Sequence, residues 1–269
     1  MNSHFVDAGG IQTHYLEAGQ GNPIILLHGG GAGADAWSNW RGCIPLLAQH
    51  FRVLAMDMVG FGKTDKPDPT AFIYSQDARA QHLASFIEAL DLQKVNLVGN
   101  SMGGATSLGV CMSRSELVEK LVLMGSAGLN AELSDALRVI LSYAPSRENM
   151  QKLVQVLTHD GFQVDPELLE YRYNLTQQPG VMAAYGATMK WIAQQGGLFY
   201  PEEAITQVKH KTLIVNGKQD KIVPPELGWK FSQLLDNSRL YLIPHCGHWA
   251  MIEHPQEFCD MVTWFLLHA

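Results

Sequence analysis

The chain has 269 residues, of which 46% are hydrophobic and 17% are charged, and its net charge at pH 7 is −7. A chain of this length can bury a core without disulfides, and its composition excludes disordered, collagen-like and coiled-coil proteins. With 19 Lys and Arg against 26 Asp and Glu, it has no excess of positive charge to bind a nucleic-acid backbone. We therefore predict no nucleic-acid partner.

The sequence also lacks the patterns of a secreted or membrane protein. Its first ten residues show no basic segment followed by an apolar one, and no run approaches 18 apolar residues. The cysteines form no C-x-x-C pair, and we expect them to be reduced and packed as small apolar groups. They are Cys43, Cys111, Cys246 and Cys259. From these observations we expect no membrane association and a cytoplasmic location.

Short apolar runs along the chain predict the strands of one sheet. Around Val6 and over residues 12–17 apolar and polar residues alternate, which predicts an antiparallel hairpin at the sheet edge with its turn at Gly9-Gly10. Six later runs are continuously apolar, which is typical of parallel strands covered on both faces. These runs are residues 23–28, 52–57, 95–99, 120–124, 212–216 and 240–243.

Segments with helical spacing separate these runs, so the sequence predicts an α/β protein. Residues 75–90 place their apolar side chains on one face, and residues 260–267 predict an apolar C-terminal helix. Residues 133–195 contain four helix-like stretches and no convincing strand. We interpret this segment as a helical cap, residues 131–199, inserted into a core formed by residues 1–130 and 200–269.

The pentapeptide Gly99-Asn100-Ser101-Met102-Gly103 has the form G-x-S-x-G. It follows a predicted strand and begins an apolar helix, which is the strand–turn–helix context that exposes a nucleophilic serine at a sharp turn. Glycines suit such a turn because a Cβ there would collide with the neighbouring backbone. We interpret Ser101 as a nucleophile; the alternative is a strand-to-helix turn in which it only caps the helix.

A nucleophilic serine needs a base and an acid on nearby loops. His248 follows the last predicted strand, and Asp220 follows the strand before it, at the edge where parallel sheets place their active sites. The chain order serine, acid, histidine is the one expected for this kind of turn. Asp57 also ends a predicted strand, but it precedes the serine and is the weaker candidate for the acid.

The neighbourhood of His248 contains other potential metal ligands. His245, Cys246 and His254 suggest a metal site at first sight. Two ligands on a helix would be four residues apart, whereas Pro244 and Gly247 predict a loop here. We therefore expect no metal and no other cofactor.

A glycine-rich segment, residues 28–33, follows the predicted strand 23–28. Its backbone N–H groups can stabilise a developing oxyanion, with the N–H of Met102 as the second donor. The alternative is a dinucleotide-binding motif, Gly29-x-Gly31-x-x-Ala34, with Asp57 at the end of the next strand. That alternative leaves the serine, the acid and the histidine without a role.

Arg172 lies in the predicted cap, where it and Lys190 are the only cations between residues 160 and 197. Its planar guanidinium suits bidentate binding of a substrate carboxylate. The alternative is a local ion pair with Glu167 or Glu170.

Several longer strings give the sequence a family resemblance over nearly its whole length. It resembles the α/β-hydrolase family and, more narrowly, the meta-cleavage product hydrolases, which hydrolyse a carbon–carbon bond in ring-fission products of aromatic compounds. The matching strings are HGGGAGADAWSNW, MDMVGFGKTD, GNSMGGATSL, LVLMGSAGL, WIAQQGGLFY and IPHCGHWAMIEHP. The resemblance implies a mostly parallel eight-stranded sheet with helices on both faces, an inserted helical cap, and a homodimer or higher homo-oligomer.

The resemblance also implies roles for individual residues. Ser101, Asp220 and His248 match the family's catalytic triad, and Gly30 and Met102 match its oxyanion donors. The positions that match the family's substrate-binding set are Asn39, Asn100, Arg172 and Trp249. The implied substrates are 2-hydroxy-6-oxo-6-substituted hexa-2,4-dienoates, cleaved to 2-hydroxypenta-2,4-dienoate and a carboxylic acid, with some esterase activity. A carboxylesterase with the same triad is the main alternative, and a dinucleotide-binding oxidoreductase is a distant one.

Overall fold

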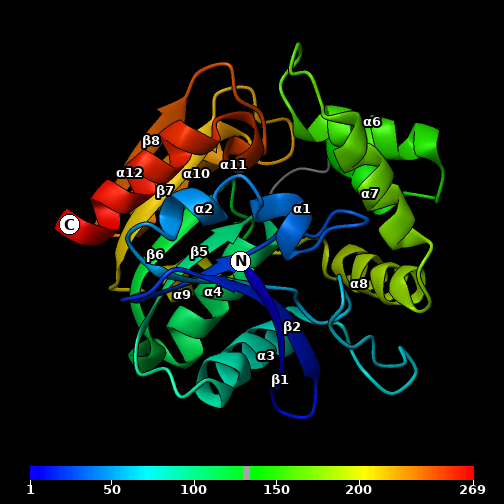
Figure 1. The fold of residues 1–269 in the computed structure, drawn as a ribbon. Coiled ribbons are helices and arrows are strands. Elements are labelled where there is room, and N and C mark those ends of the chain that lie inside the picture. The colour runs from blue at the N-terminus through cyan, green and yellow to red at the C-terminus, as the bar shows by residue number, and fades with distance from the viewer. Residues whose placement is uncertain (130–133) are drawn as a thin grey trace.

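The computed structural model describes residues 1–129 and 134–269. Eight strands form one sheet in the order β1-β2-β4-β3-β5-β6-β7-β8 (Figure 1). They are β1 (Asn2–Asp7), β2 (Gln12–Ala18), β3 (Pro23–Leu27), β4 (Arg52–Met56), β5 (Val95–Asn100), β6 (Val118–Met124), β7 (Lys211–Gly217) and β8 (Ser238–Ile243). β2 is antiparallel to β1 and β4, and every other pair is parallel. The predicted edge hairpin and the predicted mostly parallel sheet are confirmed.

The centre of the sheet is fully buried, as its apolar runs predict. All six residues of β5 are buried, and β5 lies between β3 and β6 in the middle of the sheet. The prediction of burial on both faces is wrong for β8, where Tyr241 and Leu242 are 41% and 37% exposed. β8 is the last strand of the sheet, so it lacks the neighbouring strand and part of the helical cover that bury the others.

Helices cover both faces of the sheet (Figure 1). On one side α3 (Gln76–Ala89) packs on α4 (Met102–Ser113), which also contacts α9 (Glu202–Ile205). On the other side α12 (Pro255–His268) packs on α2 (Ile44–Leu47), and α11 (Ala250–Glu253) packs on α1 (Ala36–Trp40). The remaining core elements are α10 (Pro225–Leu234), against β7 and β8, and the 3₁₀ turn η1 (Ser115–Leu117). α12 begins at Pro255 rather than at residue 260, because proline suits the first turn of a helix.

Of the five described helices between β6 and β7, the first four form a separate group beside the sheet, as predicted for residues 133–195 (Figure 1). They are α5 (Asp135–Leu141), α6 (Arg147–Leu157), α7 (Pro166–Thr176) and α8 (Val181–Gln195). The chain returns to the core close to where it left, since Gly128 N donates to Leu198 O at 2.9 Å and Tyr200 N donates to Gly128 O at 2.9 Å. The predicted boundary between residues 130 and 131 lies outside the described residues.

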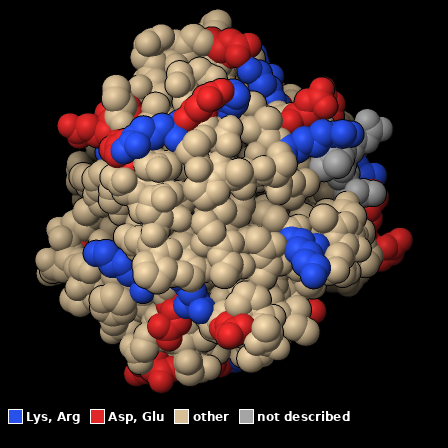
Figure 2. All heavy atoms as spheres, turned by 90° about the vertical axis from the view of Figure 1, so that its right-hand side faces the viewer, with Lys and Arg blue, Asp and Glu red and all other residues tan. Residues whose placement is uncertain are grey.

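The surface on the side of these four helices carries its charged side chains mainly around the margin, with an uncharged area in the middle (Figure 2). Within residues 1–129 and 134–269, no helix combines the length and apolar character needed to span a membrane.

Candidate active site

Ser101 lies at a sharp turn between β5 and α4. Its φ of 55° and ψ of −117° are rare for a residue with a side chain, and such strain is found mainly at functional sites. The flanking glycines are sterically required: a Cβ on Gly99 would lie 2.4 Å from Gly103 O, and one on Gly103 would lie 2.5 Å from Leu27 O. The Ser101 side chain forms no capping hydrogen bond, so the interpretation of this serine as a helix cap is wrong.

The Asp220 carboxylate is hydrogen-bonded to the imidazole of His248. Asp220 Oδ2 lies 2.8 Å from His248 Nδ1, and both side chains are buried. Asp220 Oδ1 accepts the backbone N–H groups of Ile222 and Val223 at 2.8 and 2.9 Å. A carboxylate that accepts at both oxygens places the imidazole proton on Nδ1 and leaves Nε2 as the acceptor of the neutral ring.

Ser101 and His248 line the same cavity. The hydrogen bonds of the described residues include none from Ser101 Oγ to His248. A serine and a histidine that face one cavity form the pair that nucleophilic catalysis requires.

Gly125, which directly follows β6, makes room for the aspartate–histidine pair. Its φ is +50°, and a Cβ there would lie 2.9 Å from His248 Nδ1 and 3.0 Å from Asp220 Oδ2. Any side chain would therefore disturb the pair. Sequence reasoning missed this role, and its only signal was a glycine at the end of a predicted strand.

The glycine-rich segment after β3 is held in place by His28. His28 Nδ1 donates to Gly29 O at 2.8 Å, and His28 Nε2 accepts from Met58 N at 3.0 Å. Burial lowers the pKa of His28, which keeps the ring neutral and able to make both contacts. This positioning role was also missed from the sequence.

The two predicted oxyanion donors, the backbone N–H groups of Gly30 and Met102, belong to residues that line the cavity. Neither N–H donates a hydrogen bond to another group of the described chain. A Cβ on Gly30 would lie 3.0 Å from Met102 Sδ, so the two residues pack closely. Two free and adjacent N–H donors can bind a developing oxyanion.

The cavity has a volume of about 340 Å³ and lies between the carboxyl edge of the sheet and the helices α5–α8. Besides Ser101, Ser126 and His248, four residues with polar groups line it, which we call the polar lining: Asn39, Asn100, Arg172 and Trp249. Nine of the larger apolar side chains around it define what we call the apolar lining: Leu129, Leu137, Ile140, Leu141, Met189, Ile192, Leu198, Val223 and Leu227. Of the nine predicted site residues, all but Asp220 line the cavity, and Asp220 contacts the histidine that does.

Arg172 is a fully buried cation in the polar lining. Its guanidinium donates to Asn39 Oδ1 at 3.1 Å and to Ala32 O at 2.9 Å, and Nε has no partner among the described residues. Burial lowers the pKa of Arg172 to about 10, so the group stays charged at neutral pH. It forms no ion pair within the described residues, and Glu170 pairs with Arg147 instead. The interpretation of Arg172 as a local ion-pair partner is therefore wrong.

Two other predicted residues support this lining. The Trp249 ring centroid lies 4.9 Å from the guanidinium carbon of Arg172, a cation–π contact. Asn100 Nδ2 donates to Met124 O at 3.1 Å and to His248 O at 3.4 Å, and its buried Oδ1 has no partner among the described residues. Asn100 thus contacts the backbone of the histidine as well as the cavity.

The carboxylate of Asp57, the alternative candidate for the acid of the triad, already accepts hydrogen bonds from other groups. Its carboxylate is buried, accepts the N–H groups of Ala36 and Lys63 at 2.7 and 2.8 Å, and lies 2.7 Å from His14 Nδ1. It is therefore available neither to His248 nor to the ribose of a dinucleotide. The short α1, which follows the glycine-rich segment, also differs from the long helix of a dinucleotide fold.

The residues near His248 that suggested a metal make protein contacts instead. His254 Nε2 lies 2.8 Å from His245 O. Among residues 1–129 and 134–269, no group of three or more His, Cys, Asp or Glu side chains is placed to bind a metal ion.

Comparisons with known proteins agree with this geometry. The family model of the alpha/beta hydrolase fold matches residues 22–255. The chain is 56% identical to 2-hydroxy-6-oxo-6-(2'-aminophenyl)hexa-2,4-dienoic acid hydrolase of Metapseudomonas resinovorans, covering 97% of this chain and 90% of that protein. It is 39% identical to 2-hydroxy-6-oxo-2,4-heptadienoate hydrolase of Pseudomonas putida, covering 96% and 94%.

A solved structure is equally similar. The crystal structure of a serine hydrolase involved in carbazole degradation superposes with a TM-score of 0.92 at 54% identity and covers 98% of both chains. The chain therefore belongs to the α/β hydrolases and, within them, to the meta-cleavage product hydrolases.

Proposed function

We propose that this protein hydrolyses the carbon–carbon bond of 2-hydroxy-6-oxo-6-substituted hexa-2,4-dienoates, giving 2-hydroxypenta-2,4-dienoate and a carboxylic acid. The observation that carries the proposal is Arg172, a buried guanidinium without an acidic partner among the described residues, lining the same cavity as Ser101. A buried charge is costly unless it is paired. The carboxylate of a dienoate supplies that partner, whereas a neutral ester does not.

The first chemical step is the gain of a proton on carbon, which converts the dienol to a keto form. Only the keto form allows the departing fragment to leave as a stabilised enolate. Arg172 and Asn39 hold the carboxylate end during this step, and Asn100, whose buried Oδ1 is free of protein partners within the described chain, lies in the same lining. Their contribution is orientation and charge stabilisation.

Cleavage then follows as nucleophilic catalysis. His248, oriented by Asp220, removes the proton from Ser101, whose Oγ attacks the 6-oxo carbon. The N–H groups of Gly30 and Met102 stabilise the oxyanion. The carbon–carbon bond breaks to leave an acyl group on Ser101, and a water activated by His248 releases it as a carboxylic acid.

We infer that the substituent at carbon 6 is aromatic. The apolar lining, which consists of aliphatic side chains and methionine, suits an apolar substituent, and the choice of an aromatic one rests on the relatives. The relative from Metapseudomonas resinovorans, at 56% identity, is named for a 2'-aminophenyl substrate, while the heptadienoate relative is less similar at 39%. Among substrates that differ only at carbon 6, aryl dienoates are therefore the preferred ones.

We also propose how the chain is organised and where it works. Residues 131–199 form a cap over a core of residues 1–130 and 200–269, and the cap supplies Arg172 and much of the apolar lining. The four cysteines are buried free thiols, which suits the cytoplasm. A homodimer or higher homo-oligomer is the expected assembly, and light scattering of the purified protein tests it.

The test of the proposed function is direct. The purified protein is incubated with 2-hydroxy-6-oxo-6-phenylhexa-2,4-dienoate, and the products are identified by mass spectrometry. We expect benzoate and 2-hydroxypenta-2,4-dienoate in equal amounts, and a higher kcat/KM than for a p-nitrophenyl ester. Ester hydrolysis without dienoate cleavage would identify a carboxylesterase instead.

A further inference from the structure

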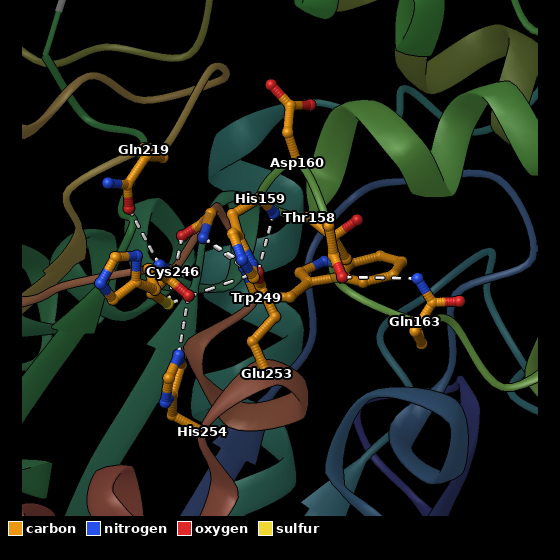
Figure 3. Close-up of polar contacts among 12 residues, drawn as sticks. Thr158, His159, Asp160, Gln163, Gln219, Cys246, Trp249, Glu253 and His254 are labelled. Carbon is orange, nitrogen blue, oxygen red and sulfur yellow. Dashed lines mark hydrogen bonds and ion pairs between the residues drawn. The ribbon is translucent and has the colours of Figure 1, made fainter.

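A buried carboxylate with no role in the mechanism above lies behind the histidine loop, which we define as residues 244–249. Glu253 ends α11, and its side chain is 0% exposed. Its Oε1 accepts the N–H groups of Gly247 and Trp249 at 3.0 and 3.2 Å. Its Oε2 accepts the N–H of His159 at 2.8 Å and lies 3.1 Å from His159 Nδ1 (Figure 3). Three of these partners are backbone N–H groups, so both oxygens of Glu253 accept hydrogen bonds.

These contacts fix the backbone on both sides of His248. Gly247 and Trp249 flank it, and both donate to Glu253. The N–H of His248 itself donates to Leu157 O, the last residue of α6, at 2.9 Å. Three consecutive N–H groups of the histidine loop are thus taken up by one carboxylate and one helix end. The imidazole ring of His248 is held separately, by its hydrogen bond with Asp220.

The histidine loop is also packed without spare room between the core and the end of α6. A Cβ on Gly247 would lie 2.6 Å from His159 N, and a Cβ on Gly217, at the end of β7, would lie 2.1 Å from Gly247 O. Because backbone touches backbone on both sides, a shift of the α6 end is transmitted to the loop. The contact with Glu253 fixes where that end lies.

A second link from the same helix end is much weaker. Asp160 pairs with Lys221, next to Asp220, at 2.6 Å, but the Asp160 side chain is 90% exposed. Exposed ion pairs contribute little because water screens them. The Glu253 contacts are buried and charge-assisted, so they provide the stronger connection.

We propose that Glu253 is a positioning residue for the reaction: it fixes the histidine loop to His159 at the end of α6 and thereby sets the place of His248 Nε2 relative to Ser101. This rests on the proposed role of His248 as the base. Glu253 does not line the cavity and acts through the histidine loop, so its loss lowers the rate with every substrate that Ser101 attacks. The hydrogen bonds of Arg172 to Asn39 and Ala32 do not involve Glu253, so the binding of the dienoate carboxylate should change much less than the rate.

The test is Glu253→Gln, which keeps the side-chain size but turns one accepting oxygen into an NH₂ group that faces N–H donors. We expect kcat to fall about 10- to 100-fold with the phenyl dienoate and with a p-nitrophenyl ester alike, because small displacements of a catalytic group cost factors of this order. KM for the dienoate should stay within about twofold, since the hydrogen bonds that hold Arg172 do not involve Glu253. Covalent labelling of Ser101 by a fluorophosphonate should slow by a factor similar to that in kcat.

Glu257→Gln is the matched control. Glu257 lies in α12, is 40% exposed and contacts Tyr241 Oη and, at 3.8 Å, His254 Nδ1, but it makes no direct hydrogen bond to the histidine loop within the described chain. It should keep the wild-type kcat. His159→Ala removes only the ring contact and keeps the backbone donor, so its loss of kcat should be smaller than that of Glu253→Gln. Glu253→Asp restores a carboxylate and should regain part of the labelling rate.

Folding of each variant is checked by circular dichroism and thermal melting. A folded Glu253→Gln protein with wild-type kcat and labelling rate would overturn the proposal, and so would a loss that is confined to KM. If Glu253→Gln does not fold, a folded Glu253→Asp with an unchanged labelling rate overturns it equally. Labelling needs no dienoate, so the role of Glu253 is decided even if the proposed substrate class is wrong.

Discussion

The polar and apolar linings of the cavity are built in different ways. Side chains of the polar lining are fixed by directional hydrogen bonds to the backbone: Arg172 donates to Ala32 O, and Asn100 donates to Met124 O. The apolar lining is assembled by packing, from α5, α8 and the segments that follow β6 and β7. Most of its side chains are aliphatic and make no directional contacts.

The two linings face different parts of the proposed substrates. The polar lining binds the carboxylate that all dienoates share, and the apolar lining binds the substituent at carbon 6 that differs among them. A directional polar site discriminates strongly, because a substrate without the matching group leaves buried polar atoms unpaired. An apolar site discriminates weakly, by about 1–3 kcal/mol for a small change in size. The polar lining therefore selects the dienoate carboxylate, and the apolar lining adjusts the preference among substituents. Substitution of residues that act on every substrate should therefore have the largest effects, and substitution within one lining should have smaller and more selective ones.

Ser101→Ala has the largest expected effect, because Ser101 forms the covalent bond with dienoates and esters alike. Turnover of dienoates and of esters should be abolished, with the fold and ligand binding intact. Stopped-flow absorbance measures the turnover of the dienoate, and equilibrium titration with the dienoate measures its binding. Retention of more than a few per cent of wild-type turnover would show that another residue is the nucleophile.

Asp220→Asn should lower kcat by about 10⁴-fold, because an amide favours the wrong tautomer of the imidazole. The loss should be the same for dienoates and esters, since Asp220 does not line the cavity. Steady-state kinetics on both substrates check this. A loss restricted to dienoates would place Asp220 in substrate recognition rather than behind the base.

Arg172→Gln should impair the polar lining alone, and therefore lower the activity on dienoates but not on neutral esters. A charged hydrogen bond in a buried site contributes about 1.5–3 kcal/mol, so kcat/KM for dienoates should fall roughly 10- to 150-fold. We expect kcat to fall as well as KM to rise, because tautomerisation moves charge toward the carboxylate. Hydrolysis of a neutral p-nitrophenyl ester should hardly change.

Equal losses on dienoate and ester would mean that Arg172 only supports the packing of α7 against the core. A circular dichroism melt of the same variant separates the two cases, because a packing role also lowers the melting temperature.

Ile192→Phe should have the smallest effect and act on the apolar lining alone. Ile192 is a buried residue of α8 that lines the cavity. A larger side chain there should lower kcat/KM for the phenyl dienoate about 10-fold more than for the methyl analogue, which is the scale of discrimination in apolar pockets. The methyl substrate is the internal control. An unchanged ratio of kcat/KM between the phenyl and methyl dienoates would show that the substituent at carbon 6 does not bind next to Ile192.

Much of the fold was predictable from local patterns. Continuous apolar runs located the strands, because parallel strands are buried on both faces. The exposure of Tyr241 and Leu242 could not be predicted, since an edge strand of a parallel sheet can have the same apolar sequence as a central one. The start of α12 at Pro255 was missed because the apolar periodicity begins later than the helix.

The candidate site was predictable where chemistry is local in sequence. The turn at Ser101 and the loops at Asp220 and His248 follow strands, so their order and position place them at one edge of the sheet. Gly125 was not predictable, because its role depends on a contact with residues far along the chain. Glu253 and the apolar lining were missed for the same reason.

The most direct test is the structure of Ser101→Ala with 2-hydroxy-6-oxo-6-phenylhexa-2,4-dienoate bound. The account predicts the carboxylate within hydrogen-bond distance of the Arg172 guanidinium, the 6-oxo group facing the N–H groups of Gly30 and Met102, and the phenyl ring against the apolar lining. A bound dienoate with its carboxylate away from Arg172, or with its phenyl ring against the polar lining, would contradict it.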